Sequence, residues 1–223
     1  MIDRYSLSVS ADKILKQSNY KASLKHIRSF NINPLQKASI FIEKDGIRHI
    51  RAVWGLLPHF SKELINRGNL FNASADGIAS KPSYRIPIRQ RRCLIPADSY
   101  YLFFDKQWYR VMRRDRSVLF FAGLYDEVCL DDDIYHSFSM VTVPPNRDLK
   151  ELQKCMPVAM REDSFTDWLS PSAPLNTVLS LLKVSENYQW VYYPISKAIA
   201  NDNYNAPDVH DEMQSEKTLF DLV

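Results

Sequence analysis

Strand-like patterning dominates the middle of the chain. Runs rich in β-branched and aromatic residues lie at 93–95, 99–104, 108–113, 118–125 and 135–143, and polar, turn-like segments separate them. Short, closely spaced strands of this kind favour antiparallel connections over alternating strand–helix units. An earlier pair at 38–43 and 47–53 flanks Asp45-Gly46, which is typical of a hairpin turn. A last strand is predicted at 190–194.

Helical segments are expected on either side of these strands. Ser10 is a typical N-cap for a helix over 11–17, with Asp12 in its first turn. Further helical pieces are predicted at 20–27, 61–67, 146–154, 163–169 and 175–183. The pattern predicts an α+β protein, one domain over residues 1–223, with a curved, barrel-like, mainly antiparallel sheet and flanking helices.

Composition removes several classes of protein. The 223 residues are 45% hydrophobic and 25% charged, as in ordinary globular domains. The longest apolar run, 118–125, is far shorter than the roughly 20 residues of a membrane span, and no secretory signal is visible. Three widely spaced cysteines without a Cys-x-x-Cys pair predict a reducing, cytoplasmic location. Five scattered histidines and only five glycines predict no metal and no cofactor.

Charge is distributed unevenly along the chain. Residues 85–116 hold nine basic and three acidic side chains, 9 − 3 = +6, and residues 201–223 hold one basic and six acidic, 1 − 6 = −5. A basic middle favours a polyanionic partner, and an acidic end suggests a solvated tail. The alternative is that both are ordinary solvated surface.

Four short segments and a later fifth carry a more specific signal. They read WGLLP at 54–58, NASAD at 72–76, KPSYR at 81–85, RRCLIPAD at 91–98 and MPV at 156–158. Their order and spacing closely resemble the SOS-response-associated peptidase family, the abasic-site-processing proteins, from Arg4 to about Ile199. The resemblance implies binding to single-stranded or junction DNA. It also implies capture of an abasic-site aldehyde by an N-terminal cysteine, which closes a thiazolidine with help from a glutamate and a histidine.

The catalytic positions implied by this resemblance are all substituted. Ile2 stands where the family has its cysteine, Leu102 stands for the glutamate and Gln153 for the histidine. Two arginines of the family pattern are replaced by Ser74 and Cys155. When catalytic residues act together, the loss of one costs about as much activity as the loss of all. We therefore expect a catalytically silent member that forms no thiazolidine crosslink.

The DNA-binding positions are better kept. The resemblance suggests DNA contacts by seven residues, which are Arg4, Trp54, Asn72, Lys81, Arg85, Arg91 and Arg92. Trp54 would stack on a base, and the cations would neutralise phosphates. The alternatives are that Trp54 is a core aromatic, that Asn72 satisfies a turn, and that Arg91 or Arg92 pairs with an acid.

Several functional hypotheses therefore remain open. The first is a pseudoenzyme that still binds single-stranded or junction DNA. The second is a structural or partner-binding protein whose DNA face has been lost. A third is a reversible Schiff base through the amine of Met1, and a fourth is a displaced nucleophile, either Cys155 or Cys93.

Overall fold

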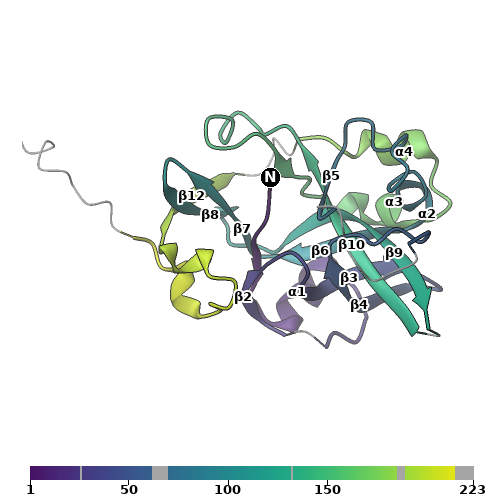
Figure 1. The fold of residues 1–223 in the computed structure, drawn as a ribbon, viewed down its shortest axis with the longest axis horizontal. Helices are drawn as coiled ribbons and strands as arrows, with labels where there is room; N and C mark the ends of the chain where they lie inside the picture. Colours follow the sequence, from purple (N-terminus) through teal and green to yellow (C-terminus); the bar gives the residue numbers. More distant parts are fainter. Residues whose placement is uncertain (26, 62–69, 132, 185–188, 214–223) are drawn as a thin grey trace, which may run out of the picture.

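Two β-sheets form the framework of the protein (Figure 1). The computed structural model describes residues 1–25, 27–61, 70–131, 133–184 and 189–213. The first sheet has the order β12-β8-β7-β1-β2. Its strands are β1 Tyr5–Leu7, β2 Ser29–Ile32, β7 Ser99–Phe104, β8 Gln107–Arg113 and β12 Trp190–Ile195. The second contains β3 Lys37–Glu43, β4 Ile47–Trp54, β5 Asn72–Ser74, β6 Arg92–Ala97, β9 Leu119–Leu130, β10 Asp133–Val143 and β11 Met156–Pro157.

The second sheet closes on itself. Strand β10 pairs with β9 in antiparallel fashion and with β4 in parallel fashion, so that β10-β4-β3-β6-β9 form a five-stranded barrel. Closure removes the unpaired strand edges that an open sheet would expose. The predicted α+β class with a barrel-like, mainly antiparallel sheet is confirmed, and the parallel pairings of β10 with β4 and β5 are the exceptions.

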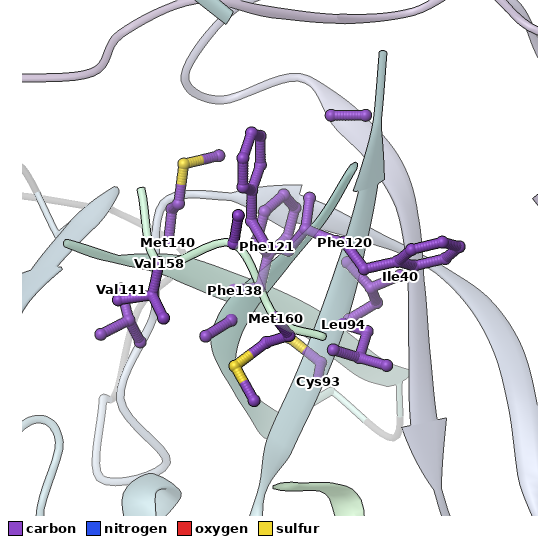
Figure 2. Close-up of a cluster of buried hydrophobic side chains, with 14 of the residues drawn as sticks. Ile40, Cys93, Leu94, Phe120, Phe121, Phe138, Met140, Val141, Val158 and Met160 are labelled. Carbon is purple, nitrogen blue, oxygen red and sulfur yellow. The ribbon is translucent and has the colours of Figure 1, made fainter. Parts of the chain in front are cut away.

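The barrel interior is a dense apolar core. Figure 2 shows buried hydrophobic side chains of β3, β6, β9 and β10 in one core cluster, with Phe120, Phe121 and Phe138 among them. Packing is tight at Gly123 on β9, where an added Cβ would lie 2.6 Å from the Cys93 sulfur. A glycine is required at this crossing because neighbouring strands bring that sulfur against its backbone.

Helices are short and cover the sheets. They are α1 Ala11–Ser18, α2 Pro87–Gln90, α3 Phe165–Leu169 and α4 Leu175–Ser180, with 3₁₀ turns η1 Glu162–Ser164, η2 Lys197–Ala200 and η3 Pro207–His210. The Ser10 cap is confirmed, since its side chain accepts a hydrogen bond from the Lys13 amide. No helix among the described residues is long and apolar enough to cross a membrane.

Two helix predictions were wrong. Residues 20–25 form no helix, because the left-handed Asn19 ends α1 and the side chains that follow alternate between partly buried and exposed. Residues 147–152 form consecutive turns, in which the Asn146 side chain accepts the Leu149 amide and competes with a helical bond. The helix predicted at 61–67 lies outside the described residues except for Ser61.

The described part of the acidic C-terminal segment is anchored to the first sheet, while its acidic side chains are exposed. Val209 is fully buried in a small cluster with Tyr101 and Ile199. The Tyr101 hydroxyl donates to the Phe30 carbonyl and lies 2.9 Å from Nε2 of His210. Residues up to Met213 therefore cover one face of the first sheet.

Candidate functional site

The N-terminus lies between the five-stranded sheet and the barrel (Figure 1). Strand β1 is paired on both sides, with β2 and β7, which fixes the path of the residues before it. Ile2 is 1% exposed, whereas Met1 is 73% exposed. The Asn72 side-chain amide donates to the Ile2 carbonyl, so β5 holds the first residues of the chain against the barrel.

Leu102 and Gln153, the other two positions that the resemblance relates to catalytic residues, lie beside this segment. Leu102 is 6% exposed and belongs to the same buried cluster as Ile2 and Tyr100. Tyr100 and Leu102 are two residues apart on β7 and so face the same side of the sheet. Gln153, after the 147–152 turns, donates from Nε2 to the Tyr100 hydroxyl at 2.7 Å. The fold therefore brings Ile2, Leu102 and Gln153 into one region.

This region contains two buried acceptors without partners. The Asn72 Oδ1 and the Gln153 Oε1 are both buried and accept no hydrogen bond. Burial raises the pKa of the Tyr100 hydroxyl, which therefore stays protonated at neutral pH. These side chains can donate and accept hydrogen bonds, but none of the three exchanges a proton readily near pH 7.

One acidic residue of this region was missed by the sequence analysis. Asp3 follows the buried Ile2 and is itself partly buried. Burial raises the pKa of its carboxyl above the ordinary value, and the neighbouring Arg4 opposes that shift. The available signal was a charged side chain immediately after an apolar residue that the motif alignment places in the pocket.

The Arg4 side chain makes contacts within the fold. Its guanidinium donates to the side chains of Asn31 and Asn33 on and after β2, and to Asp202 at 2.7 Å. It also lies over the Trp108 ring, 5.5 Å from the centroid. Arg4 therefore fastens the C-terminal segment to β1 and β2, and the expected role of Arg4 as a phosphate contact is not supported by this geometry.

Trp54 is a core residue, which corrects its expected role in base stacking. Its side chain is fully buried, and its ring stacks on Phe138 at 6.4 Å between centroids. The indole N–H donates to the Phe71 carbonyl at 2.8 Å. No face of the ring is open to a nucleotide.

Arg91, at the end of α2, and Arg92, the first residue of β6, differ in exposure. Arg92 is 1% exposed and donates to the carbonyls of Ile88, Trp168 and Ser170, which corrects its expected role as a DNA contact. Arg91 is partly exposed and forms an ion pair with the fully buried Asp126. Arg91 is therefore a neutralised cation at the barrel surface.

The remaining predicted cations are exposed. Arg85 lies at the surface, and Lys81 donates from Nζ to the Asp76 carbonyl at 3.0 Å. Ser74 is exposed on β5, two residues after Asn72. The basic window 85–116 as a whole does not form one patch, because Arg92 is buried inside it and Arg110 is bonded to Asp98, Ser99 and Tyr193.

An aromatic surface that the sequence analysis missed borders the Leu102 region. Leu102 pairs with Tyr109, Phe104 follows Leu102 by two residues, and Tyr192 pairs with Val111, so these side chains share one face. Phe104 is 40% and Tyr192 44% exposed, and the Tyr109 and Tyr192 rings lie 6.0 Å apart. We call Phe104, Tyr109 and Tyr192 the aromatic shelf. Only the strand register reveals it, because its members come from three strands.

The cysteines offer no thiol at the position of Ile2. Cys93 is buried in the barrel, and burial raises the pKa of its thiol well above the ordinary value. Cys129 is exposed on β9, and Cys155 is partly buried two residues after Gln153. In the part of the chain that the structure describes, no group of three or more His, Cys, Asp or Glu side chains is arranged to hold a metal ion.

Comparison with known proteins gives a consistent result. The model of the SOS response associated peptidase (SRAP) family matches residues 1–202. The protein is 25% identical to the abasic site processing protein YoqW of Bacillus subtilis, over 94% of this chain and 98% of that one. It is 27% identical to YoaM of the same organism, another abasic site processing protein, over 95% and 98%.

Solved structures share the fold. A protein from Bacteroides thetaiotaomicron superposes with a TM-score of 0.82 at 22% identity, covering 95% of this chain and 99% of that one. A protein from Bordetella bronchiseptica gives 0.76 at 18% identity, covering 87% and 99%. At these identities the likeness concerns the fold alone.

Proposed function

This chain belongs to the SOS response associated peptidase family, and from that premise we propose that it binds single-stranded or junction DNA around its N-terminus without forming a covalent crosslink. The observation that supports this proposal most directly concerns Ile2. Asn72 bonds the main chain of this residue, while the side chain is a buried hydrocarbon. The family name and the names of the relatives support DNA as the partner class.

The loss of crosslinking follows from the chemistry of the site. A thiazolidine forms from an amine and a thiol that are carried by two neighbouring carbon atoms, and Ile2 supplies no sulfur. Leu102 cannot transfer a proton, and Gln153 is bonded to a Tyr100 hydroxyl whose pKa burial has raised. The side chains of Ile2, Leu102 and Gln153 therefore supply no group that would react with an abasic aldehyde.

Binding itself is supported by side chains that remain exposed. The aromatic shelf offers ring faces to unstacked bases, an interaction of roughly 1–3 kcal/mol per base. Lys81 and Arg85 are exposed cations that can neutralise phosphates. Each phosphate contact adds about 0.7 to the salt dependence of single-strand binding.

The test is a fluorescence-anisotropy titration on single-stranded, junction and abasic DNA over a range of salt. We expect binding that weakens with salt, and no adduct on a denaturing gel. The triple variant Ile2→Cys, Leu102→Glu, Gln153→His should gain a stable adduct with abasic DNA only. Failure of the natural protein to bind any of the three at low salt would contradict the proposal and favour a structural or protein-binding role.

A second candidate activity is a reversible Schiff base. Met1 is exposed while Ile2 is buried, so an amine on Met1 can meet an abasic aldehyde. The nitrogen would bond to the aldehyde carbon with loss of water, and added borohydride would reduce the C=N bond to a stable amine. Absence of a borohydride-trapped band at high protein concentration would exclude this activity.

A further inference from the structure

A basic pocket lies at the opposite end of β1 from the candidate site. It has a volume of about 290 Å³ and lies between the edge strand β2 and the β3–β4 hairpin. Buried Leu7 and Ile32 contribute apolar lining, and Arg28, Lys37 and Arg51 contribute its charge. From Ile2 to Leu7 is five residues of nearly extended chain, or about 16 Å, which is too far for one bound nucleotide to reach both.

The charge of this pocket is of a single sign. Among the described residues, eleven line this pocket, and they include three cations and no carboxylate. Lys37 and Arg51 come together because Ser39 pairs with Arg51 across the hairpin. The Arg51 guanidinium also donates to the Lys37 carbonyl at 2.8 Å. The larger pocket beside Arg110 differs, because Asp98, Asp211 and Glu212 balance its cations.

The uncharged polar side chains of the pocket also favour an anionic ligand. The Gln36 side-chain oxygen already accepts the Asn33 amide at 3.2 Å. The Asn205 side-chain oxygen already accepts the Phe30 amide at 2.6 Å and the Ser29 hydroxyl at 3.3 Å. Both carboxamides are left with N–H groups to offer a ligand, so cations and donors face an apolar floor.

We propose that this pocket binds a phosphate group. Three cations and two carboxamide donors match the charge and the acceptor oxygens of a phosphate. The group belongs either to a nucleic-acid backbone or to a small phosphate ester. The nucleic-acid source rests on the proposed function and would extend the DNA contact beyond the N-terminal site. The small-molecule source does not depend on it.

The test measures two ligands separately. Inorganic pyrophosphate binding is followed by calorimetry, and single-stranded DNA binding by anisotropy over a range of salt. The variants are Arg28→Ala and Lys37→Ala, with Arg48→Ala as control. Arg48 is an exposed cation on the same hairpin that forms an ion pair with exposed Asp45, and it is not among the described residues that line the pocket. We expect each pocket variant to weaken pyrophosphate binding at least threefold relative to the control.

The DNA-binding measurement shows whether the bound phosphate belongs to a DNA backbone or to a small ester. If the phosphate belongs to a DNA backbone, each pocket variant also lowers the salt slope of DNA binding by about 0.7. If it belongs to a small ester, DNA binding matches the control while pyrophosphate binding falls. Pyrophosphate binding that is absent, or equal in the pocket variants and Arg48→Ala, overturns the proposal. Loss of the DNA signal alone would count against the proposed function and not against this pocket.

Discussion

Replacing Arg92 by methionine tests whether this residue supports the fold or contacts DNA. Arg92 is 1% exposed, and its guanidinium donates to three main-chain carbonyls, of Ile88, Trp168 and Ser170. Burial lowers the pKa of Arg92 to about 10, so it stays charged at neutral pH. The cation thus joins α2, through Ile88, to the C-terminal end of α3.

The size of the effect follows from these bonds. Methionine keeps most of the apolar stem but no donor, and a buried acceptor without a partner costs about 1–3 kcal/mol. Three such carbonyls set an upper range of roughly 3–9 kcal/mol. Two effects reduce the expected loss of stability to about 3–5 kcal/mol. Water can reach the partly buried Ser170 carbonyl, and the variant no longer has the desolvation cost of a buried cation. For a chain of this length that corresponds to a fall in Tm of roughly 6–20 °C.

The measurement is thermal unfolding followed by circular dichroism, with Arg85→Met as the matched control. Arg85 is exposed, so its loss should change the free energy of unfolding by less than about 0.5 kcal/mol. DNA affinity of Arg92→Met is measured well below its lowered Tm. An unchanged Tm together with lost DNA binding would refute the structural assignment of Arg92.

Three further predictions follow from other parts of the molecule. Tyr192→Ala should weaken single-stranded DNA binding by about 1–3 kcal/mol with an unchanged salt slope, and an altered slope would contradict stacking. Burial lowers the pKa of His210 to about 4, so the stability it contributes is complete above pH 6.5 and lost as pH falls towards 4. Urea unfolding of His210→Gln should show less loss over that window. Gly123→Ala should lower stability by about 1–3 kcal/mol, since the new methyl meets the Cys93 sulfur. Chemical denaturation checks this, and Cys93→Ala should restore part of the loss.

Much of the fold was predictable because its signals are local. The Ser10 cap, the Asp45-Gly46 turn and the strands from β6 to β10 depend on neighbouring residues, and the structure confirms them. The failures have local reasons as well. Residues 20–25 alternate with period two, which is an extended pattern, and the Asn146 side chain replaces a helical bond with a turn.

Some properties of the candidate site were also predictable from the sequence. Residue type alone establishes that Ile2 has no sulfur and that neither Leu102 nor Gln153 has a side chain that titrates near neutral pH. The motifs also identified the family, which the match over residues 1–202 confirms. Chemical capacity belongs to the side chain itself, so the sequence is sufficient to judge it.

Exposure and partners were decided only by the tertiary structure. Arg4 binds Asp202, which is 198 residues away along the chain, and Arg92 bonds residues 76 and 78 positions away. Trp54 is buried by β10, and the aromatic shelf and the basic pocket each draw on several segments. Whether a charge or a ring meets solvent depends on what the rest of the chain packs against it, and local sequence does not carry that information.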